Sequence, residues 1–446
     1  MQEGLTTVGI TAEEYALRRQ RLFERMPAGS IALLPAAEEK HRNADTEYPF
    51  RQESNFYYLS GFKEAGALLV LIKEQEGRTE FILFCRSSEP AAEIWVGKRM
   101  GPEGAVKHLG ADRAFAIEEQ DKLMPLLLGD KQHIFYSLGH HTAWDLRIIS
   151  WFNSVRSKAK MGPKAPEAWI DLLAWIAEDR LIKSPAEIRL MRKAAIISAA
   201  AHQRLIKQCA PNKMEYELEA EFLQACYQEG CRAMAYPSII GGGGNACTLH
   251  YIHNDAILKA GELVLVDAGG EYEYYAADIT RTFPINGQFT ADQKSIYEVV
   301  LRAQLAAIEQ IRPGLPWDKL QETIVEVVVQ GLIDLGILKG TLQTLIQQKA
   351  YRPFYMHSSG HWLGLDVHDV GEYQLNGVWR RLEAGMVLTV EPGIYIAPGH
   401  PTVDKRWWGI GVRIEDDILV TKKGYEVLTA DAPKTVEAIE KMMKTS

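Results

Sequence analysis

The amino-acid sequence predicts a two-domain protein in which an α/β domain precedes a mixed α+β domain. The chain has 446 residues, 47% of them hydrophobic, whereas a single hydrophobic core stops growing at roughly 250 to 300 residues. Helical and strand patterns alternate up to about Ala165. The segment 157–168, SKAKMGPKAPEA, is basic and lacks an apolar period, so we expect it to link the domains. The predicted domains are therefore residues 1–175 and 176–446.

The first domain is expected to begin with a helix and to continue with short strands. Thr11 and Glu14 have the spacing of a capping box at the start of TAEEYALRRQRLFERM, which carries a helical apolar period. GSIALLPAA, GALLVLIKEQ and TEFILFCR are predicted as strands, the last two paired across the polar turn EQEGR. A further helix is expected from Trp169 onward.

The second domain is expected to open with a long helix at KSPAEIRLMRKAAIISAAAHQRL. Ser184 is its predicted N-cap, Pro185 takes the first helical position and Glu187 completes a capping box. Helix, loop, hairpin and helix patterns follow, and then a run of strands. This order indicates a mixed α+β domain.

The charge and cysteine content exclude several classes of protein. A net charge of -8 and a pI near 5.9 provide no basic stripe for nucleic acid or an anionic membrane. No apolar run approaches the roughly 18 residues of a membrane span. The five cysteines form no CxxC pair, and the N-terminus has no basic-then-apolar signal segment. We therefore expect a cytoplasmic protein that binds neither nucleic acid nor membranes.

Two aspartates lie in the segment GELVLVDAGGEYEYYAADITRTFPI, which is predicted as a β-hairpin. Asp267 ends the first strand, Asp278 lies in the returning strand, and a Gly-Gly pair is in the connection. If the pairing is symmetric about the midpoint between Tyr272 and Glu273, the two aspartates lie opposite each other. Like charges there repel, so a cation is expected between them. The alternative is two solvated hairpin aspartates, one of which caps a turn.

Two glutamates follow in similarly apolar settings. Glu391 ends the strand of GMVLTVEPGIYI, and Glu415 lies inside that of GIGVRIEDDILV, where alternation puts it on one face with Arg413. A charged residue inside so apolar a strand is usually paired or bound to a metal. The alternative is an exposed strand face, and Asp416 and Asp417 are expected to be solvated at a strand end.

The segment YRPFYMHSSGHWLGLDVHDVG, residues 351–371, contains three of the chain's 12 histidines. One histidine and four carboxylates form a ligand set for hard or borderline dications, and oxygen-rich coordination with one imidazole favours Mn²⁺. Four carboxylates contribute roughly four negative charges, so two dications would balance them. Such a pair can lower the pKa of a bridging water and hold a carbonyl oxygen. The expected reaction is hydrolysis of an amide or ester.

These motifs resemble those of proline-specific metallopeptidases of the pita-bread fold, in particular the aminopeptidase P family. VLVDAGGEYEYYAADITRTFPI, HSSGHWLGLDVHDVG, LTVEPGIY and GVRIEDD look like its successive ligand motifs. NADTEYPFRQESNFYYLSGF looks like its creatinase-type N-terminal domain. The resemblance implies an α/β creatinase-type domain and an α+β pita-bread catalytic domain. It also implies a centre of two Mn²⁺ ions, with Co²⁺, Zn²⁺ or Mg²⁺ as other candidates. Its ligands would be Asp267 on one ion, Asp278 and Glu415 bridging both, and His361 and Glu391 completing the other.

The resemblance also implies roles for further residues of the catalytic domain. His357 and His368 match histidines that contact the substrate and shuttle protons, and His250 matches a histidine near the substrate. Glu391 would handle a proton in addition to binding metal. The alternative for the three non-ligand histidines is that each is a structural histidine with satisfied hydrogen bonds.

Three other residues match positions that in the family line the site. Tyr395 and Arg413 are two of them, and the alternative is a packed tyrosine and a strand arginine paired with an acid. Trp95 resembles a residue that a neighbouring subunit presents to the active site, which implies a homo-oligomer, either a dimer or a tetramer. The alternative for Trp95 is a core tryptophan.

The implied activity is removal of the N-terminal residue from peptides with proline in the second position. A hydroxide that bridges the metal ions would attack the carbonyl before the proline, while the nearby histidines steady the oxyanion and the leaving nitrogen. One alternative is prolidase, which resembles this chain in both domains and cuts only dipeptides. The other is a non-catalytic pita-bread protein that binds peptides; such proteins have lost ligands, whereas all five are present here.

Overall fold

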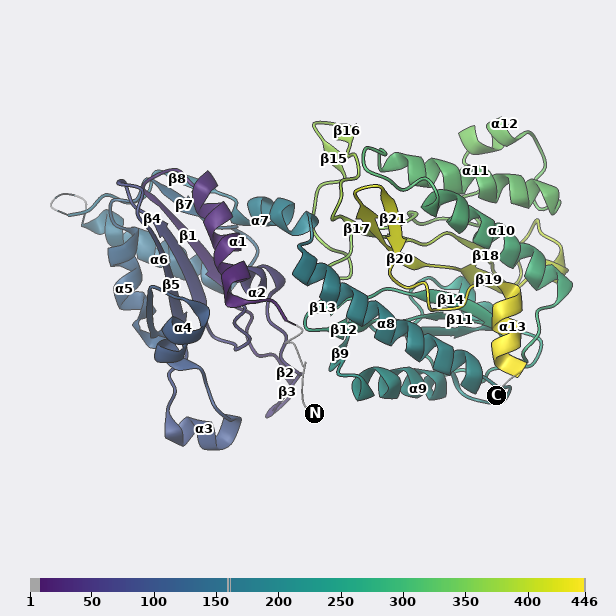
Figure 1. Cartoon of the computed structure of the whole chain (residues 1–446), viewed down its shortest axis with the longest axis horizontal. Helices are drawn as coiled ribbons and strands as arrows, with labels where there is room; N and C mark the ends of the chain where they lie inside the picture. Colours follow the sequence, from purple (N-terminus) through teal and green to yellow (C-terminus); the bar gives the residue numbers. More distant parts are fainter. Residues whose placement is uncertain (1–8, 159, 161, 445–446) are drawn as a thin grey trace. The chain divides into compact units, whose positions relative to one another are not determined.

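The computed structural model describes residues 9–158, 160 and 162–444, and the chain folds as two compact units (Figure 1). The first unit begins at Ile10, and the change of unit falls between Arg180 and Leu181. Segment 157–168 lies inside the first unit, so the expectation that it links the domains is wrong; positions 159 and 161 of it lie outside the described residues. The domain bounds at 175 and 176 stay a prediction.

The first unit is built on a six-stranded sheet with the order β6-β5-β4-β1-β7-β8. β4 and β5 pair antiparallel, as the sequence predicts, and Lys73 lies opposite Thr79 next to the turn that joins them. Trp169 lies in β8, so the helix expected from that residue begins only at Leu172. The strands are β1 (Ser30–Pro35), β4 (Leu68–Lys73), β5 (Thr79–Cys85), β6 (Arg113–Ala116), β7 (His133–Phe135) and β8 (Ala168–Ile170), with a separate hairpin of β2 (His41–Asn43) and β3 (Thr46–Glu47).

Helices cover the sheet of the first unit. The Thr11 hydroxyl accepts a hydrogen bond from the Glu14 N–H at 3.3 Å and caps the first helix, as predicted. On one face of the sheet, apolar residues of α5 and α6 such as Met124 and Ile148 pack against the strands. The helices are α1 (Ala12–Arg25), α2 (Ser54–Ser60), α3 (Pro90–Val96), α4 (Gly101–Leu109), η1 (Ile117–Glu119), α5 (Gln120–Leu128), α6 (Thr142–Ser157) and α7 (Leu172–Leu181).

The second unit contains several small antiparallel sheets between helices. In Figure 1, α8 and α9 border the strands along one side, and α10 and α11 along the other. The sheet orders are β10-β11-β14, β13-β12-β9, β17-β20-β21, β18-β19 and β15-β16. The strands are β9 (Ala233–Met234), β10 (Ile239–Gly242), β11 (Leu263–Asp267), β12 (Gly270–Tyr272), β13 (Tyr275–Ala276), β14 (Thr280–Pro284), β15 (Gln374–Leu375), β16 (Val378–Trp379), β17 (Val387–Val390), β18 (Gly393–Ile396), β19 (Ile410–Arg413), β20 (Asp416–Thr421) and β21 (Gly424–Val427).

The long helix at the start of the second unit begins as the sequence predicts. Ser184 and Glu187 form a capping box, in which each side chain accepts a backbone N–H of the other, and Pro185 is the first helical residue. No helix of the described part of the chain has the length and apolar character needed to cross a membrane. The helices are α8 (Pro185–Gln208), α9 (Glu215–Gln228), η2 (Gly243–Cys247), α10 (Ala291–Ile308), α11 (Asp318–Asp334), α12 (Leu342–Gln347), η3 (Lys405–Trp407) and α13 (Val436–Lys444).

The hairpin that carries the two aspartates is present, but its register differs from the predicted one. Asp267 lies opposite Thr280, because the turn is formed by Glu273 and Tyr274, both with positive φ. A turn centred one residue later than expected shifts every pairing by two residues. Asp278 therefore lies in the break between β13 and β14 and not opposite Asp267 within a strand pair.

Candidate active site

A cavity of about 820 Å³ lies within the second unit. Its lining brings together residues from distant parts of the sequence, from Tyr236 before β10 to Glu415 in the break after β19. All five predicted metal ligands and most of the other predicted site residues line it, namely His250, Asp267, Asp278, His357, His361, His368, Glu391, Arg413 and Glu415.

The β11 hairpin positions two of the carboxylates. A Cβ on Gly269 would lie 1.8 Å from the carbonyl oxygen of Ala277, so only glycine allows the two halves of the hairpin to approach this closely. Asp267 and Asp278 are both buried there. The hydroxyl of Tyr236 lies 2.6 Å from Oδ1 of each, so two acids share one phenol donor. Acids this close need a proton or a cation between them.

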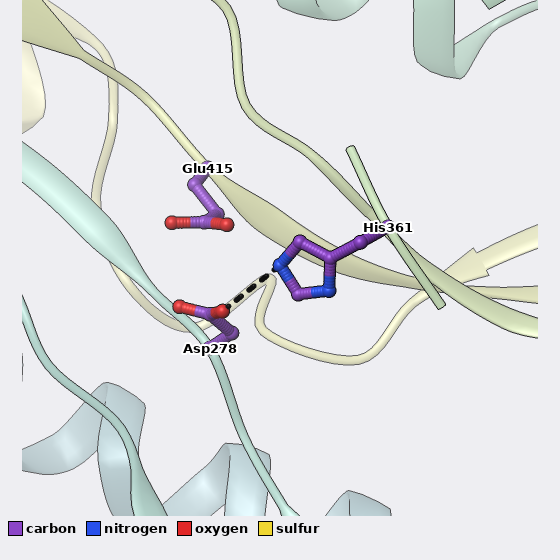
Figure 2. A group of neighbouring side chains, drawn as sticks. All are labelled: Asp278, His361 and Glu415. Atoms are coloured by element: carbon purple, nitrogen blue, oxygen red, sulfur yellow. Dashed lines mark ion pairs between the residues drawn. The ribbon is translucent and has the colours of Figure 1, made fainter. Parts of the chain in front are cut away.

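Asp278, His361 and Glu415 form the tightest group of potential ligands. Each offers one ligand atom, and these atoms lie within 4.8 Å of one another. Figure 2 shows the three side chains pointing toward a common centre from separate segments, and Nε2 of His361 lies 3.3 Å from Oδ2 of Asp278. The other ring nitrogen, Nδ1, lies 2.9 Å from the Trp362 carbonyl, which orients Nε2 into the group.

Glu391 extends this group from the end of β17, as the sequence predicts. Its Oε1 lies 3.6 Å from Nε2 of His361, and its Oε2 lies 3.7 Å from Nδ1 of His357. Thr389 joins the two segments, because its hydroxyl accepts the His361 N–H at 3.0 Å and lies 3.4 Å from Oε1 of Glu391. The backbone N–H of Glu391 also donates to the Ser359 carbonyl at 2.9 Å.

Glu415 lies in the break between β19 and β20, and not inside a strand as expected. Its N–H donates to the Thr280 carbonyl at 3.1 Å, and its Oε2 accepts the Thr280 hydroxyl at 2.6 Å. Arg281, which is fully buried, donates to the Glu415 carbonyl at 2.6 Å. The glutamate is therefore held by its backbone as well as by its carboxylate.

Asp416 and Asp417 are buried, so the expectation that they are solvated at a strand end is wrong. They are 0% and 1% exposed, and Asp416 forms ion pairs with Arg281 and Lys434, each at 2.7 Å. These cations lower the pKa of Asp416 to about 2 in spite of burial. Asp417 accepts the Asp278 N–H at 3.1 Å and so supports a carboxylate of the cavity.

Three of the four cavity acids, Asp267, Glu391 and Glu415, carry raised pKa values because burial and the mutual repulsion of the carboxylates disfavour the charged forms. Burial raises the pKa of Asp267, and burial with the charges of Asp278 and Asp267 raises that of Glu391 to about 7. The pKa of Glu415 is raised well above its usual value for the same reasons. For Asp278, burial is outweighed by the hydrogen bond and charge of His361, which hold its pKa low. Asp278 in turn raises the pKa of His361 to about 9, against the effect of burial.

Arg413 is the arginine that faces this group of acids. Its guanidinium donates to Oδ2 of Asp267 at 2.6 Å, to the Tyr395 hydroxyl at 2.9 Å and to the Thr280 hydroxyl at 3.1 Å. Four carboxylates converge on one guanidinium and one imidazole, and carboxylate oxygens with an imidazole nitrogen are a donor set for divalent cations. The residues present therefore fit a divalent metal ion, which would supply the positive charge that the raised pKa values of Asp267, Glu391 and Glu415 call for.

Comparison with known proteins agrees with this geometry. A family model described as metallopeptidase family M24 matches residues 189–422, and one described as the aminopeptidase P N-terminal domain matches residues 15–136. A Xaa-Pro aminopeptidase of Escherichia coli (strain K12) is 45% identical over 434 residues, which cover 97% of this chain and 98% of that protein. The chain belongs to metallopeptidase family M24.

Other members of this family are similar over nearly the whole chain. Rattus norvegicus Xaa-Pro aminopeptidase 3 is 35% identical over 99% of this chain and 88% of its own length. The solved structure of Pseudomonas aeruginosa aminopeptidase PepP is 48% identical, with a TM-score of 0.96 over 98% of this chain and 99% of that chain. The expected fold class, a creatinase-type N-terminal domain with a pita-bread domain, is confirmed. As a member of family M24, the chain is a hydrolase that uses divalent metal.

The histidines expected near the substrate in this metallopeptidase lie beside the candidate metal ligands. Burial with the charge of Arg413 lowers the pKa of His357 to about 4, and the neutral ring donates Nδ1–H to the Ser358 carbonyl and accepts the Tyr395 hydroxyl at Nε2, each at 2.8 Å. The ring of His368 lies 4.3 Å from that of His361. Partial burial and the charge of His361 lower the pKa of His368. Their roles in catalysis stay predictions.

Two of the expected residues lie outside the cavity lining. Tyr395 is buried behind it, where its hydroxyl joins His357 to Arg413. Trp95 lies on α3 of the first unit and is 87% exposed, so the alternative of a core tryptophan is wrong. Its expected contact with a neighbouring subunit stays a prediction.

Sequence reasoning missed several residues of the site. Tyr236 binds both hairpin aspartates, and a lone tyrosine before a proline carries no signal that would single it out. An aromatic group of the cavity lining, Trp317, Tyr373 and Trp379, was also missed. The Asn-Gly pair at positions 376 and 377, two residues before Trp379, is a strong hairpin signal that could have located this group.

Proposed function

We propose that this chain removes the N-terminal residue from peptides that have proline in the second position. The observation that carries this proposal is the buried cluster of Asp278, His361 and Glu415 at a cavity large enough for a short peptide. It stands in a chain that is 45% identical, over almost its whole length, to a Xaa-Pro aminopeptidase. A product complex of a zinc-substituted Escherichia coli aminopeptidase P is 45% identical, with a TM-score of 0.96.

The proposed centre holds two divalent ions, with Mn²⁺ as the favoured metal and Co²⁺, Zn²⁺ or Mg²⁺ as other candidates. Four carboxylates carry roughly four negative charges, which two dications balance. When bound, the ions polarise the carbonyl before the proline and activate a water. The residues that would hold them are Asp267, Asp278, His361, Glu391 and Glu415, of which Asp278, His361 and Glu415 form the tightest group.

The chain's own groups position the peptide and move the proton. Glu391, whose Oε2 lies 3.7 Å from Nδ1 of His357, is proposed to pass a proton between water and the leaving nitrogen. His357 is neutral at pH 7, and its Nδ1–H donates to the Ser358 carbonyl while Nε2 accepts the Tyr395 hydroxyl, each at 2.8 Å, so it is proposed to steady the reacting groups by holding this hydroxyl beside the site. His250 and His368 face the same cavity and are proposed to contact the peptide.

Arg413 is proposed to act through the groups that it holds. Its contacts with Asp267 and Tyr395 keep the carboxylate directed at the metal cluster and the phenol against His357. The exposed Trp95 is proposed to complete the site of a neighbouring copy in a homo-oligomer. A cytoplasmic location and domain bounds at 1–175 and 176–446 also remain predictions.

The test compares three peptides under one set of conditions with Mn²⁺ present: Ala-Pro, Ala-Pro-Gly and Ala-Ala-Gly. We expect the tripeptide with proline to lose its first residue, the alanine tripeptide to be a poor substrate, and a chelator to stop the reaction. Cleavage of Ala-Pro alone would identify a prolidase instead. Equal cleavage of Ala-Ala-Gly would reject proline specificity, and cleavage of none would favour a non-catalytic peptide-binding protein.

A further inference from the structure

Lys183 and Asp369 form an ion pair inside the second unit, and none of the roles proposed above uses it. Nζ of Lys183 lies 2.9 Å from Oδ2 of Asp369, and the two side chains are 1% and 0% exposed. A buried ion pair is often no more stabilising than two apolar side chains of the same volume, because both charges lose their hydration. Such a pair can instead fix a position, and Asp369 directly follows His368 in the chain.

The lysine extends from a backbone that is itself fixed. Lys183 directly precedes Ser184, the N-cap whose capping box sets the start of α8. The Lys183 N–H donates to the Gly385 carbonyl at 2.9 Å, and its Nζ lies 3.5 Å from the Leu181 carbonyl. The ammonium group is therefore a fixed point against which Asp369 is placed.

Asp369 closes the segment that carries two of the site histidines, residues 361–369, here called the histidine loop. Its N–H donates to the Trp362 carbonyl at 2.9 Å, and its Oδ1 accepts the Asp366 N–H at 3.4 Å. The other carboxylate oxygen, Oδ2, is the one that faces Lys183. One carboxylate thus joins the histidine loop to the residue before the N-cap of α8.

The ion pair packs directly against the backbone of the histidine loop. A Cβ on Gly364 would lie 2.3 Å from Oδ2 of Asp369 and 2.9 Å from Cε of Lys183, so glycine is needed for this close approach. The Gly364 carbonyl in turn accepts the Ala276 N–H at 2.9 Å. The pair and the loop are in contact, so a shift of one displaces the other.

The two histidines of the loop differ in how they are held. The His361 N–H donates to the Thr389 hydroxyl at 3.0 Å, and the His361 carbonyl accepts the Thr389 N–H at 2.9 Å, so β17 holds this end of the loop. The ring of His368 lies 4.3 Å from that of His361, and no residue in the described part of the chain forms a hydrogen bond with it. The position of His368 therefore depends on its backbone, which continues into Asp369.

We propose that Lys183 and Asp369 are positioning residues that hold His368 in the active site, an inference that rests on the proposed function. The pair acts on His368 through the adjoining backbone, whereas His361 keeps its own bonds to β17. Loss of the pair should therefore lower turnover without removing metal.

The test replaces the ion pair with apolar side chains of similar volume, Lys183→Met with Asp369→Leu, in the full-length chain loaded with Mn²⁺. This double variant leaves no unpaired buried charge, so its free energy of unfolding should stay close to that of the wild type. Misplacing His368 should lower kcat on Ala-Pro-Gly by about 10- to 100-fold, while the Mn²⁺ content stays near normal. Arg192→Met is the matched control, because it removes a cation of α8 from a partly exposed pair with Glu426 and should change neither quantity.

The same replacement in a His368→Ala chain separates positioning from a general structural role. If the ion pair acts through His368, the double variant should lower kcat of the His368→Ala chain by less than about twofold. Asp369→Asn keeps the volume but offers one oxygen where the carboxylate uses two. It provides the same comparison if the apolar pair does not fold.

Three results would overturn the assignment. An unchanged kcat would show that the pair does not hold His368 in place. Equal losses of kcat in the wild-type and His368→Ala chains would show that the pair acts elsewhere, and loss of Mn²⁺ would show that it supports a metal ligand instead. In each of these cases the wild type still cleaves Ala-Pro-Gly, so the proposed function stands; a wild type that cleaves no peptide would overturn both.

Discussion

His202 shows how a single buried side chain ties the stability of the second unit to pH. It is 0% exposed on α8, and its Nε2 donates to the Ala268 carbonyl at 2.9 Å, next to Asp267. Burial lowers its pKa to about 3, whereas an unfolded histidine titrates near 6.5. Below pH 6.5 the unfolded chain therefore binds a proton that the folded chain does not, so the free energy of unfolding falls as the pH falls from about 6.5 toward 3.

The prediction for His202 is a loss of about 1.4 kcal/mol of stability at pH 5.5 relative to pH 7.5 from this residue. His202→Gln keeps an amide N–H that can donate to the Ala268 carbonyl but does not titrate. Urea unfolding measures the free energy of unfolding of the wild type and of His202→Gln at both pH values. The difference between the two proteins at pH 7.5 gives the cost of altered packing, which is subtracted from their difference at pH 5.5. Identical pH dependence in the wild type and the variant would contradict the assignment.

At the scale of elements, helix α9 positions the segment that carries His250. Glu215 is 0% exposed, and its two carboxylate oxygens accept from the N–H groups of Gly242 and Ala256, at 2.7 and 2.9 Å, and from the Tyr251 hydroxyl at 2.8 Å. One turn later on the same helix, Glu219 accepts from the Asn254 side chain at 3.0 Å. The segment around His250 is thus fixed on both sides by acids of one helix.

Replacing Glu215 with glutamine should loosen this segment, because an amide nitrogen would face donors that the carboxylate now satisfies. We expect a loss of about 2 to 4 kcal/mol in the free energy of unfolding, together with lower turnover on Ala-Pro-Gly. Glu221→Gln is the matched control on the same helix, since its pair with Arg204 is partly exposed and should matter by less than about 0.5 kcal/mol. Equal turnover in Glu215→Gln and wild type would reject the positioning role.

The sequence predicted correctly those features that are determined by residues close together in the chain, and not those that depend on tertiary contacts. The capping box of Ser184 is settled within four residues and was predicted correctly. The hairpin register was wrong because Glu273 and Tyr274 adopt positive φ without the Asn or Gly that usually marks such a turn. The burial of Asp416 depends on Arg281 and Lys434, partners that only the tertiary fold brings close, so no local pattern could show it.

In the molecule as a whole, five side chains from distant segments are proposed to act as one metal centre. The order of the ligand motifs could be predicted because each motif is short and rich in acids or histidines. Their convergence could not, because it depends on the packing of β11, β17 and β19 around one cavity. Tyr236 and Thr280, which hydrogen-bond the candidate ligand carboxylates, were missed because nothing in the local sequence distinguishes them from other tyrosines and threonines.

Metal analysis of the wild type, His361→Ala and His357→Ala, each dialysed against Mn²⁺ and then freed of loosely bound ions, tests whether these side chains form a metal centre. We predict two Mn²⁺ per chain in the wild type, because two dications balance the four carboxylates. Nε2 of His361 points into the cluster, whereas His357 bonds Tyr395, so the two variants should differ in metal content. His361→Ala should be depleted of metal, whereas His357→Ala should keep a near-normal content and lose turnover on Ala-Pro-Gly. Equal metal content in all three proteins, or a wild type that is fully active without metal, would contradict the account.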